Sequence, residues 1–452
     1  MLNPKTLFSM GTTQGVTARF GLLASLQEFA IWLPLPVVVL HMTDRGLDLA
    51  LVGLAFGLRA LFVVLLEVPT GGLADAIGRK PVALLSQTFT LISFIVLLYA
   101  GGPATAVLYA IFQGIGAALH SGALDAWYVD ALKRIDPEAP LQRYLAIIDV
   151  LQSAGMLVAA ALGGLLPSLA SGWGLPYPLT GYGVALFAGV VMRALVWLLT
   201  ATLVTEPPRP ATEGVAGLHA VPQILRDAAR LSREIPVVRY LLFSAGASGV
   251  ALIALETFWQ PIAALEFGGV ASESQVFGGL GLLMGVAVLL GSLAILRYGE
   301  IFPGGPAFLA AATQAAKGVF MLLLASQAGP LGIAAGLALS YFALSANNVP
   351  HEALLNEAIP SERRSVMLSL NSLSLFLGIA IGSTVLGLLA SQMGAGVALA
   401  IAAIFTVVAA FAYVWMHFIS ADAARPALGT SLLEGAPVEG RDEKQPLADT
   451  GD

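Results

Sequence analysis

Apolar runs of about 20 residues dominate the chain, and each is long enough to cross a bilayer as an α-helix. Glycines, prolines and clusters of charge interrupt these runs and mark their ends. The pattern predicts an all-α membrane protein with twelve transmembrane helices, six in each half of the chain. The predicted helices cover residues 18–41, 49–70, 81–100, 104–132, 142–168 and 178–204, and then 236–262, 274–296, 304–326, 330–358, 364–391 and 394–419.

The remaining segments divide the chain into five parts. Residues 1–17 form a predicted N-terminal segment, 18–204 and 236–420 the two helical bundles, and 205–235 a linker between them. The linker has the polarity of a solvated segment, in which one amphipathic helix is expected, and it contains Pro207, Pro208, Pro210, Arg226, Arg230 and Arg233. Residues 421–452 are rich in glycine, proline and acids and are predicted to be a disordered tail.

Composition supports the membrane assignment and narrows the function. Charged residues make up 11 % of the chain and hydrophobic residues 57 %, whereas about 25 % of an average soluble domain is charged. The absence of cysteine excludes disulfides, thiolate metal sites and thiol catalysis. The five histidines are scattered without ligand spacing, and the sequence has no phosphate-binding nucleotide loop. We therefore expect no metal, no cofactor, no enzymatic activity and no nucleic-acid partner.

Positive charges are distributed unevenly around the predicted helices. If the N-terminus is cytoplasmic, 18 of the 22 Lys and Arg residues fall on the cytoplasmic side, and only Arg45 falls on the other side. The remaining three, Arg59, Arg193 and Lys317, lie within helices. Cytoplasmic loops of membrane proteins carry such an excess of positive charge. The bias predicts a multi-pass protein of the cytoplasmic (inner) membrane with both termini in the cytoplasm.

Two similar segments end the fourth and the tenth predicted helices. Residues 125–132 read Asp-Ala-Trp-Tyr-Val-Asp-Ala-Leu, and residues 352–359 read Glu-Ala-Leu-Leu-Asn-Glu-Ala-Ile. An acid, an alanine, a second acid and a second alanine are in register. Because the segments occupy the same ordinal helix of each half, they indicate a parallel duplication of a six-helix unit and hence two pseudo-symmetric bundles.

In one short stretch between the second and third predicted helices, the individual residues are more informative than the composition. Gly71 and Gly78 permit a tight reversal, and Asp75 can accept backbone N–H bonds. Arg79 and Lys80 place paired positive charge where a helix leaves the membrane. The simpler interpretation is a positively charged turn that sets orientation, and the alternative is a gate loop of a transporter.

The stretch fits the pattern Gly-x-x-x-Asp-x-x-Gly-Arg-Lys, and in a duplicated twelve-helix chain it resembles the corresponding loop of the major facilitator superfamily. The resemblance implies the fold of that superfamily and a transport function. It also implies that Asp75 and Arg79 take part in a cytoplasmic charge cluster. An acid near the inner end of the fourth helix, here Asp130, joins this cluster, which helps to hold the outward-facing state. The chain departs from the pattern at Ala76, where a basic residue is usual, and this departure would weaken the cluster.

Two further motifs bear on the mode of transport. Residues 113–116, Gln-Gly-Ile-Gly, resemble the superfamily's proton-coupling segment, but Ala110 stands where its membrane-embedded arginine is expected. Gly155, Gly163 and Gly164 resemble the glycine-rich bend of drug/proton antiporters without its Gly-Pro step. With the junction at residues 356–364, these likenesses favour a bacterial export-type member. We expect proton-coupled efflux of a small solute, with proton-coupled uptake by symport or a non-transporting sensor or partner protein as alternatives.

Ionisable side chains inside the first-half helices are candidates for function, because a charge near the bilayer centre costs about 2.5–3.5 kcal/mol on insertion scales. They are Glu28, Arg59, Asp125, Asp149 and Arg193. One interpretation is a buried ion pair that only fixes helix register, such as Arg59 with Glu28 or Asp125. In the functional interpretation, Arg59 supplies the positive charge that Ala110 lacks. A neighbouring carboxylate, protonated from one side and deprotonated on the other, then couples transport to the proton gradient.

The second half contains its own set of candidate polar side chains. They are Glu256, Asn347, Asn348 and Glu352. The resemblance implies that the first, fourth, seventh and tenth helices line the central cavity, and Glu28, Asp125, Glu256 and Glu352 then lie on one lining helix each. Lys317, on the peripheral ninth helix, is expected to form a structural pair or to extend to the membrane surface. His351 is expected either to titrate near neutral pH or to act as a hydrogen-bonded spacer.

Aromatic and small residues complete the sequence-based predictions. Five aromatic residues fall on lining helices, where they are packing or interfacial residues in the simpler interpretation: Trp32, Trp127, Tyr128, Phe258 and Trp259. If they face the cavity, they would suit a bulky, partly apolar solute, including a cationic one. Glycine pairs at 53 and 57, 278 and 281, and 378 and 382 permit close helix approach. The expected partners are a small solute, protons and the lipid bilayer, with the protein acting as a monomer.

Overall fold

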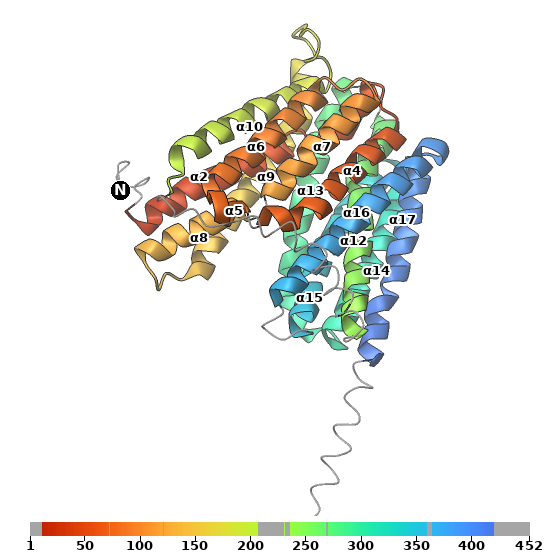
Figure 1. The fold of residues 1–452 in the computed structure, drawn as a ribbon. Helices are drawn as coiled ribbons and strands as arrows, with labels where there is room; N and C mark the ends of the chain where they lie inside the picture. Colours follow the sequence, from red (N-terminus) through yellow and green to blue (C-terminus); the bar gives the residue numbers. More distant parts are fainter. Residues whose placement is uncertain are drawn as a thin grey trace, which may run out of the picture.

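A computed structural model describes residues 11–71, 73–120, 122–206, 230, 236–267, 270–358 and 364–419. In that part of the chain, all regular secondary structure is helical (Figure 1). The predictions for residues 1–10, for most of the linker at 205–235 and for the tail at 421–452 concern residues outside the described ones.

Twelve helical segments among the described residues are long and apolar enough to cross a membrane, which confirms the predicted all-α fold. The first half contains α2 (Thr13–Trp32), α3 (Val38–Asp44), α4 (Leu49–Gly71), α5 (Leu73–Ile77), α6 (Arg79–Leu98), α7 (Pro103–His120), α8 (Ala123–Ile135), α9 (Leu141–Ala170) and α10 (Gly183–Leu203). The second half contains α12 (Pro236–Phe267), α13 (Val270–Tyr298), α14 (Gly305–Ala325), α15 (Gly329–Glu357), α16 (Arg364–Met393) and α17 (Ala395–Ala409), the last extended to Ile419 in the twelfth span. Span one combines α2 and α3, and span four combines α7 and α8.

The two halves form two helical lobes that contact one another mainly through two helix pairs. Helix α4 of the first lobe packs along α16 of the second, and α9 of the first packs along α13 of the second. These are the second and eleventh spans and the fifth and eighth spans. Each span of one half corresponds to the span six places later or earlier in the other half, so the second corresponds to the eighth and the fifth to the eleventh. The two pairs are therefore equivalent, as expected for a parallel duplication of a six-helix unit. The contacts therefore support the pseudo-symmetry inferred from the repeat.

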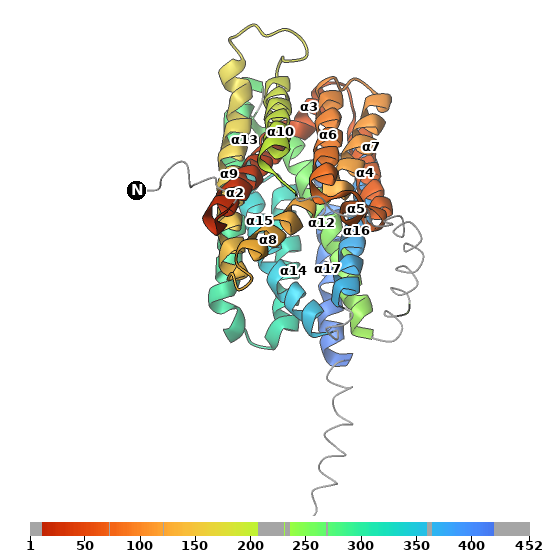
Figure 2. The ribbon, with the colours of Figure 1, turned by 60° about the vertical axis from the view of Figure 1, so that its left-hand side comes forward.

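The lobes meet at one end of the molecule and diverge toward the other. We call the end where α2 begins and the twelfth span finishes the terminal end, and the opposite one the far end. Figures 1 and 2 show the helices of the first lobe inclined to those of the second, with α3 among the segments near the far end. Gly53 near the start of α4 and Gly164 near the close of α9 both contact the opposite lobe at this far end.

Glycine makes both cross-lobe contacts possible, because the backbones approach too closely for a side chain. A Cβ placed on Gly53 would overlap the carbonyl of Ser383, and one on Gly164 would overlap the backbone of Gly278. Gly378 likewise packs against the backbone of Gly246 between α16 and α12. The predicted role of the small-residue patterns in close helix packing is thus confirmed.

A break in the first span is stabilised from the other lobe. Helix α2 ends at Trp32, and a 3₁₀ turn (Leu35–Val37) containing Pro36 leads into α3. The N–H of Val39 lies in the first turn of α3, where no intrahelical acceptor exists. It donates to Gln260 Oε1 of α12 at 3.0 Å, while Gln260 Nε2 donates to the carbonyl of Leu35 at 2.9 Å. An amide side chain suits this position because it donates and accepts at once.

Replacement of Gln260 by methionine tests the cross-lobe bond. Gln260→Met keeps an unbranched side chain of similar length but leaves the buried Val39 N–H without its acceptor, at a cost of about 2 kcal/mol. We expect a lower midpoint of thermal unfolding, measured by the fraction of purified protein that stays monodisperse after heating. Gln142→Met, an exposed position on α9, is the control and should leave the midpoint unchanged. Equal midpoints for the two variants would contradict this role of Gln260.

The close contact of α9 and α13 gives a second prediction. Gly164→Leu should force the two helices apart, and a cysteine placed at the neighbouring buried Ala160 should then react faster with a maleimide. Because the chain has no native cysteine, the single label reports this position alone. Gly279→Leu is the matched control, since a Cβ there meets no atom within 4 Å. Unchanged labelling in Gly164→Leu would show that the far end tolerates the added side chain without opening.

Candidate functional site

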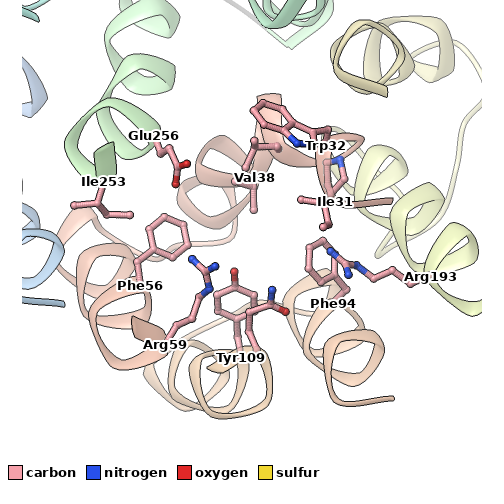
Figure 3. A pocket seen from close by; sticks show the side chains of 13 residues that line it. Ile31, Trp32, Val38, Phe56, Arg59, Phe94, Tyr109, Arg193, Ile253 and Glu256 are labelled. Carbon is pink, nitrogen blue, oxygen red and sulfur yellow. The ribbon is translucent and has the colours of Figure 1, made fainter. Parts of the chain in front are cut away.

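A chamber of about 170 Å³ lies between the lobes, next to the break in the first span. Figure 3 shows its walls. Arg59 comes from α4, Tyr109 from α7 and Arg193 from α10, all in the first lobe, whereas Glu256 comes from α12 of the second lobe. Ile31, Trp32, Phe56, Phe94 and Ile253 are among the apolar side chains of the wall. The first lobe therefore provides most of the wall and both positive charges.

A second recess of about 280 Å³ continues from the chamber into the first lobe. Arg59, Arg193 and Gln113 line both spaces, which makes them one region. More of the side chains in the wall of this recess carry hydrogen-bonding groups. Gln27 Nε2 lies 2.9 Å from a ring nitrogen of His120, and Ser93 donates to Gln113 Oε1 at 2.6 Å. Hydrogen-bonding groups thus surround one end of the space and apolar groups the other.

The two arginines have few partners of their own. The side chain of Arg193 is 8 % exposed, and its guanidinium lies 3.9 Å from the ring centroid of Phe94. Within the described residues, neither Arg59 nor Arg193 forms an ion pair within 4.0 Å, and the Nε atoms of both are buried without a hydrogen-bond partner. Figure 3 shows both side chains directed into the same space. Two positive charges therefore face one cavity.

Two carboxylates lie near these arginines without pairing with them. Glu256 interacts electrostatically with Arg59 across the lobe boundary. Glu28, one turn before Trp32 on α2, accepts a hydrogen bond from the Trp32 indole at 3.2 Å and interacts electrostatically with Arg193. The structure does not place Arg59 in an ion pair with Glu28 or Asp125, which was one interpretation of the sequence. The acid that interacts electrostatically with Arg59, Glu256, comes instead from the opposite lobe.

Other predicted site residues lie outside the chamber wall. Asp125 and Asp149 are exposed, because on α8 and α9 the adjacent Leu124 and Ile148 take the buried face. Asp125 still interacts electrostatically with Glu28. Helix α15, the tenth span, places Asn348 and Glu352 on its exposed side and Asn347 on its buried side. None of these residues is among those that line the two spaces.

Asn347, Lys317 and His351 form a separate polar region inside the second lobe. Asn347 donates to the carbonyl of Ala310 at 3.0 Å, so its amide joins α15 to α14. Lys317 is fully buried and donates to Ser248 at 3.2 Å, so it neither extends to the surface nor pairs with an acid among the described residues. The expectation for Lys317 is therefore corrected. His351 contacts Tyr413 at 2.7 Å and Asn371 at 2.9 Å, which matches the hydrogen-bonded spacer.

Of the predicted aromatic residues, only Trp32 reaches the chamber. Trp127 is buried beside Phe20, and Trp259 packs on Phe277 at 5.3 Å. Tyr109 in the chamber wall and His120 in the recess were not among the site residues expected from the sequence. The signal for both was their position on the fourth span, one and two turns from the recognised Gln113. No three His, Asp or Glu side chains in the described part of the chain come together in a way that could hold a metal ion.

Comparison with known proteins identifies the fold family. A profile of the Major Facilitator Superfamily matches residues 20–343. The chain belongs to the major facilitator superfamily. It is 22 % identical over 392 residues to an uncharacterised MFS-type transporter, YxaM of Bacillus subtilis (strain 168), covering 86 % of this chain and 91 % of that one. It is 32 % identical over 135 residues to the multidrug resistance protein MdtH of Aeromonas salmonicida (strain A449), covering 29 % of this chain and 32 % of that one.

Solved structures of the superfamily share the architecture. The crystal structure of the nucleoside transporter NupG superimposes with a TM-score of 0.70 at 17 % identity, covering 89 % of this chain and 98 % of that one. At this identity the likeness concerns the fold. Membership of the superfamily and the twelve apolar helices establish a multi-pass membrane transporter.

The loop typical of the superfamily has a defined arrangement between α5 and α6. Gly78 adopts a φ of 98°, which favours glycine, and precedes the first turn of α6. Arg79 Nη1 lies 2.6 Å from Asp130 Oδ2 of α8. Lys80 Nζ donates to the carbonyl of Ala201 at 2.7 Å. The side chain of Asp75, which the resemblance places in this cluster, lies outside the described ones, as do the surroundings of Gly71.

Glu206, which the sequence analysis did not consider, caps this loop. Its carboxylate accepts the backbone N–H groups of Arg79 and Lys80 at 3.0 and 3.1 Å. These N–H groups open α6 and have no intrahelical acceptor, and a negative charge is favourable at a helix N-terminus. Glu206 thereby ties the segment after α10 to the loop before α6.

Removal of this cap should loosen the start of α6. Glu206→Ala should cost about 1 kcal/mol locally and raise the hydrogen-exchange rate of the Arg79 and Lys80 amides about fivefold. Exchange is measured by mass spectrometry on peptides that contain residues 79–82. Glu138→Ala, an exposed acid in the α8–α9 connection, should leave this exchange unchanged. If Glu206→Ala also leaves it unchanged, the carboxylate does not cap α6.

Proposed function

We propose that this protein is a secondary active transporter that moves a small solute by alternating access. The observation that carries the proposal is a chamber with charged and aromatic walls between two six-helix lobes that hold together at one end and diverge at the other. Two packed lobes with a site at their boundary can expose that site to either side by rocking against one another. The chamber contains the side chains needed to bind a solute and exchange a proton.

The orientation of the chain in the membrane determines toward which side the chamber opens in this conformation. The excess of Lys and Arg on loops at the terminal end supports placing that end in the cytoplasm. The divergence of the lobes at that end would then open the site toward the cytoplasm. The Arg79–Asp130 pair and Glu206 lie at the same end. We propose that this loop, with Gly71, Asp75, Gly78 and Lys80, acts as the gate that biases the lobes between the two states.

Glu256 is the proposed proton carrier. It is a chamber-wall acid, and Arg59, Tyr109 and Tyr341 are the groups that interact with it electrostatically. Protonation of Glu256 would remove its attraction to Arg59 across the lobe boundary. Because that attraction joins the lobes, proton uptake and release would alter the balance between the two conformations. Glu28 and Asp125, which interact with one another, form the second group of candidates.

Export is the proposed direction. Its support is the similarity to multidrug resistance proteins over 29 % of the chain. Proton-coupled uptake is the second candidate, favoured by the similarity of the whole fold to a nucleoside transporter. Expression in a drug-sensitive bacterial host separates the two, because export raises and uptake lowers the tolerated concentration of a toxic solute. No change across a broad panel of toxic compounds, together with no flux in liposomes, would favour a sensor or partner protein.

The role of Glu256 can be separated from folding and solute binding. In liposomes, Glu256→Gln should abolish transport driven by a pH gradient while preserving exchange of labelled solute without a gradient. The reason is that exchange requires only solute binding and rocking, whereas gradient-driven transport also requires a titratable group. Glu266→Gln, an exposed acid on the same helix, is the matched control and should retain both activities. Gradient-driven transport at the wild-type rate in Glu256→Gln would remove this acid from the mechanism.

A further inference from the structure

The chamber wall contains a charge arrangement that points to the solute itself. Arg59 and Arg193 project into one space and interact electrostatically with one another. Two like charges in a poorly hydrated interior repel one another, and each loses hydration that nothing in the wall fully replaces. The arrangement is therefore unfavourable on its own, and a bound negative charge would relieve it.

The surrounding carboxylates do not supply that negative charge directly. Glu256, on the second lobe, interacts with Arg59 electrostatically across the lobe boundary. The Glu28 carboxylate accepts a hydrogen bond from the Trp32 indole. Among the described residues, neither acid forms an ion pair with either arginine within 4.0 Å. The buried Nε atoms of both guanidinium groups also lack acceptors. A guanidinium presents a planar fork of donors that matches a carboxylate, sulfonate or phosphate group.

The remaining wall defines the rest of the ligand. Phe56, Phe94 and Tyr109 place three rings around the arginines, and Ile253 faces them from the second lobe (Figure 3). Phe94 already lies under the Arg193 guanidinium, which holds this side chain in place by a cation–π contact. A ligand with a flat apolar body would bury its surface against these rings while its charged group meets the arginines.

We infer that the solute is an amphipathic organic anion, with an aromatic or alicyclic body and one carboxylate-like group held by Arg59 and Arg193. This inference rests on the proposed transport function. It keeps the partly apolar solute expected from the sequence and replaces the cationic alternative with an anion. The anion competes with Glu256 for Arg59, so its binding releases an acid that is free to take up a proton. Anion and proton would then bind together, which is the coupling that symport requires, so an anionic solute favours proton-coupled uptake, the second candidate above, over export.

Three probes of the same size test the charge preference. They are 2-naphthoate, 2-naphthamide and 2-naphthylmethylamine, and their binding to the full-length protein in lipid nanodiscs is measured by equilibrium dialysis. Partition into the lipid is subtracted with empty nanodiscs. The acid should bind about 10- to 100-fold more tightly than the amide, as expected for one charge-assisted bidentate contact. Equal binding of acid and amide, tighter binding of the amine, or no binding of the acid up to about 1 mM would each overturn the inference.

Substitutions of the chamber arginines test whether the preference for the acid over the amide arises in the chamber. Arg193→Gln should reduce the affinity for 2-naphthoate about tenfold or more and leave that for 2-naphthamide nearly unchanged, and Arg193→Lys should restore part of the loss. Arg45→Gln is the matched control, because Arg45 also lies over an aromatic ring, that of Tyr177, but outside the chamber. An acid preference that survives in both Arg193→Gln and Arg59→Gln would place the anion elsewhere. If either variant fails to fold, the wild-type comparison of the three probes still decides.

A transport assay in liposomes distinguishes a failure of this inference from a failure of the proposed function. If the acid binds with the expected preference but does not cross the membrane in liposomes, the anion site stands and the transport proposal fails for it. If the protein transports other solutes with no preference for acids, transport stands and the anion inference fails.

Discussion

Polar groups buried away from water need partners within the protein, and this constraint accounts for most of the arrangement described above. Helices satisfy their own backbones, so the informative positions are those where a helix is broken. At the break in the first span, Gln260 of the opposite lobe supplies both a donor and an acceptor. At the start of α6, Glu206 accepts two N–H groups that the helix cannot satisfy. Both partners come from segments distant in sequence.

Close packing of the two lobes depends on a second constraint, the absence of side chains where backbones touch. The α4–α16 and α9–α13 contacts use glycine at the far end, and the pseudo-symmetry of the fold relates one contact to the other. Helix association within lipid gains little from the hydrophobic effect, because lipid tails are as apolar as leucine. Smooth, close surfaces of this kind supply van der Waals contact while allowing one helix to pivot on another. Such an interface suits lobes that change their relative inclination.

The chamber is one of the places in the described part of the chain where the first constraint is not met. In the second lobe, several buried polar groups bond to one another, as Lys317 does with Ser248 and His351 with Tyr413 and Asn371. In the chamber, two guanidinium groups face open space, and among the described residues the nearby acids interact with them electrostatically without forming ion pairs. Unpaired charge in a membrane interior is costly and is therefore typical of a site that binds or moves something charged. The first lobe contributes both arginines to this site, and the second lobe contributes Glu256.

The sequence by itself determined that the protein is an all-α membrane protein with twelve spans and that it resembles the major facilitator superfamily. It also identified several candidate site residues. Helix length and apolarity are local properties, and the gate-loop motif is a local pattern, so both could be recognised without tertiary structure. Arg59, Arg193 and Glu256 could be singled out because charge is rare in an apolar helix. Only the tertiary structure decided that these three face one chamber, whereas Asp125, Asp149, Asn348 and Glu352 do not line it. The reason is that helix rotation and lobe inclination set which face of a helix is enclosed, and both depend on contacts such as Gly164–Gly278 and Gln260–Val39 between distant parts of the chain.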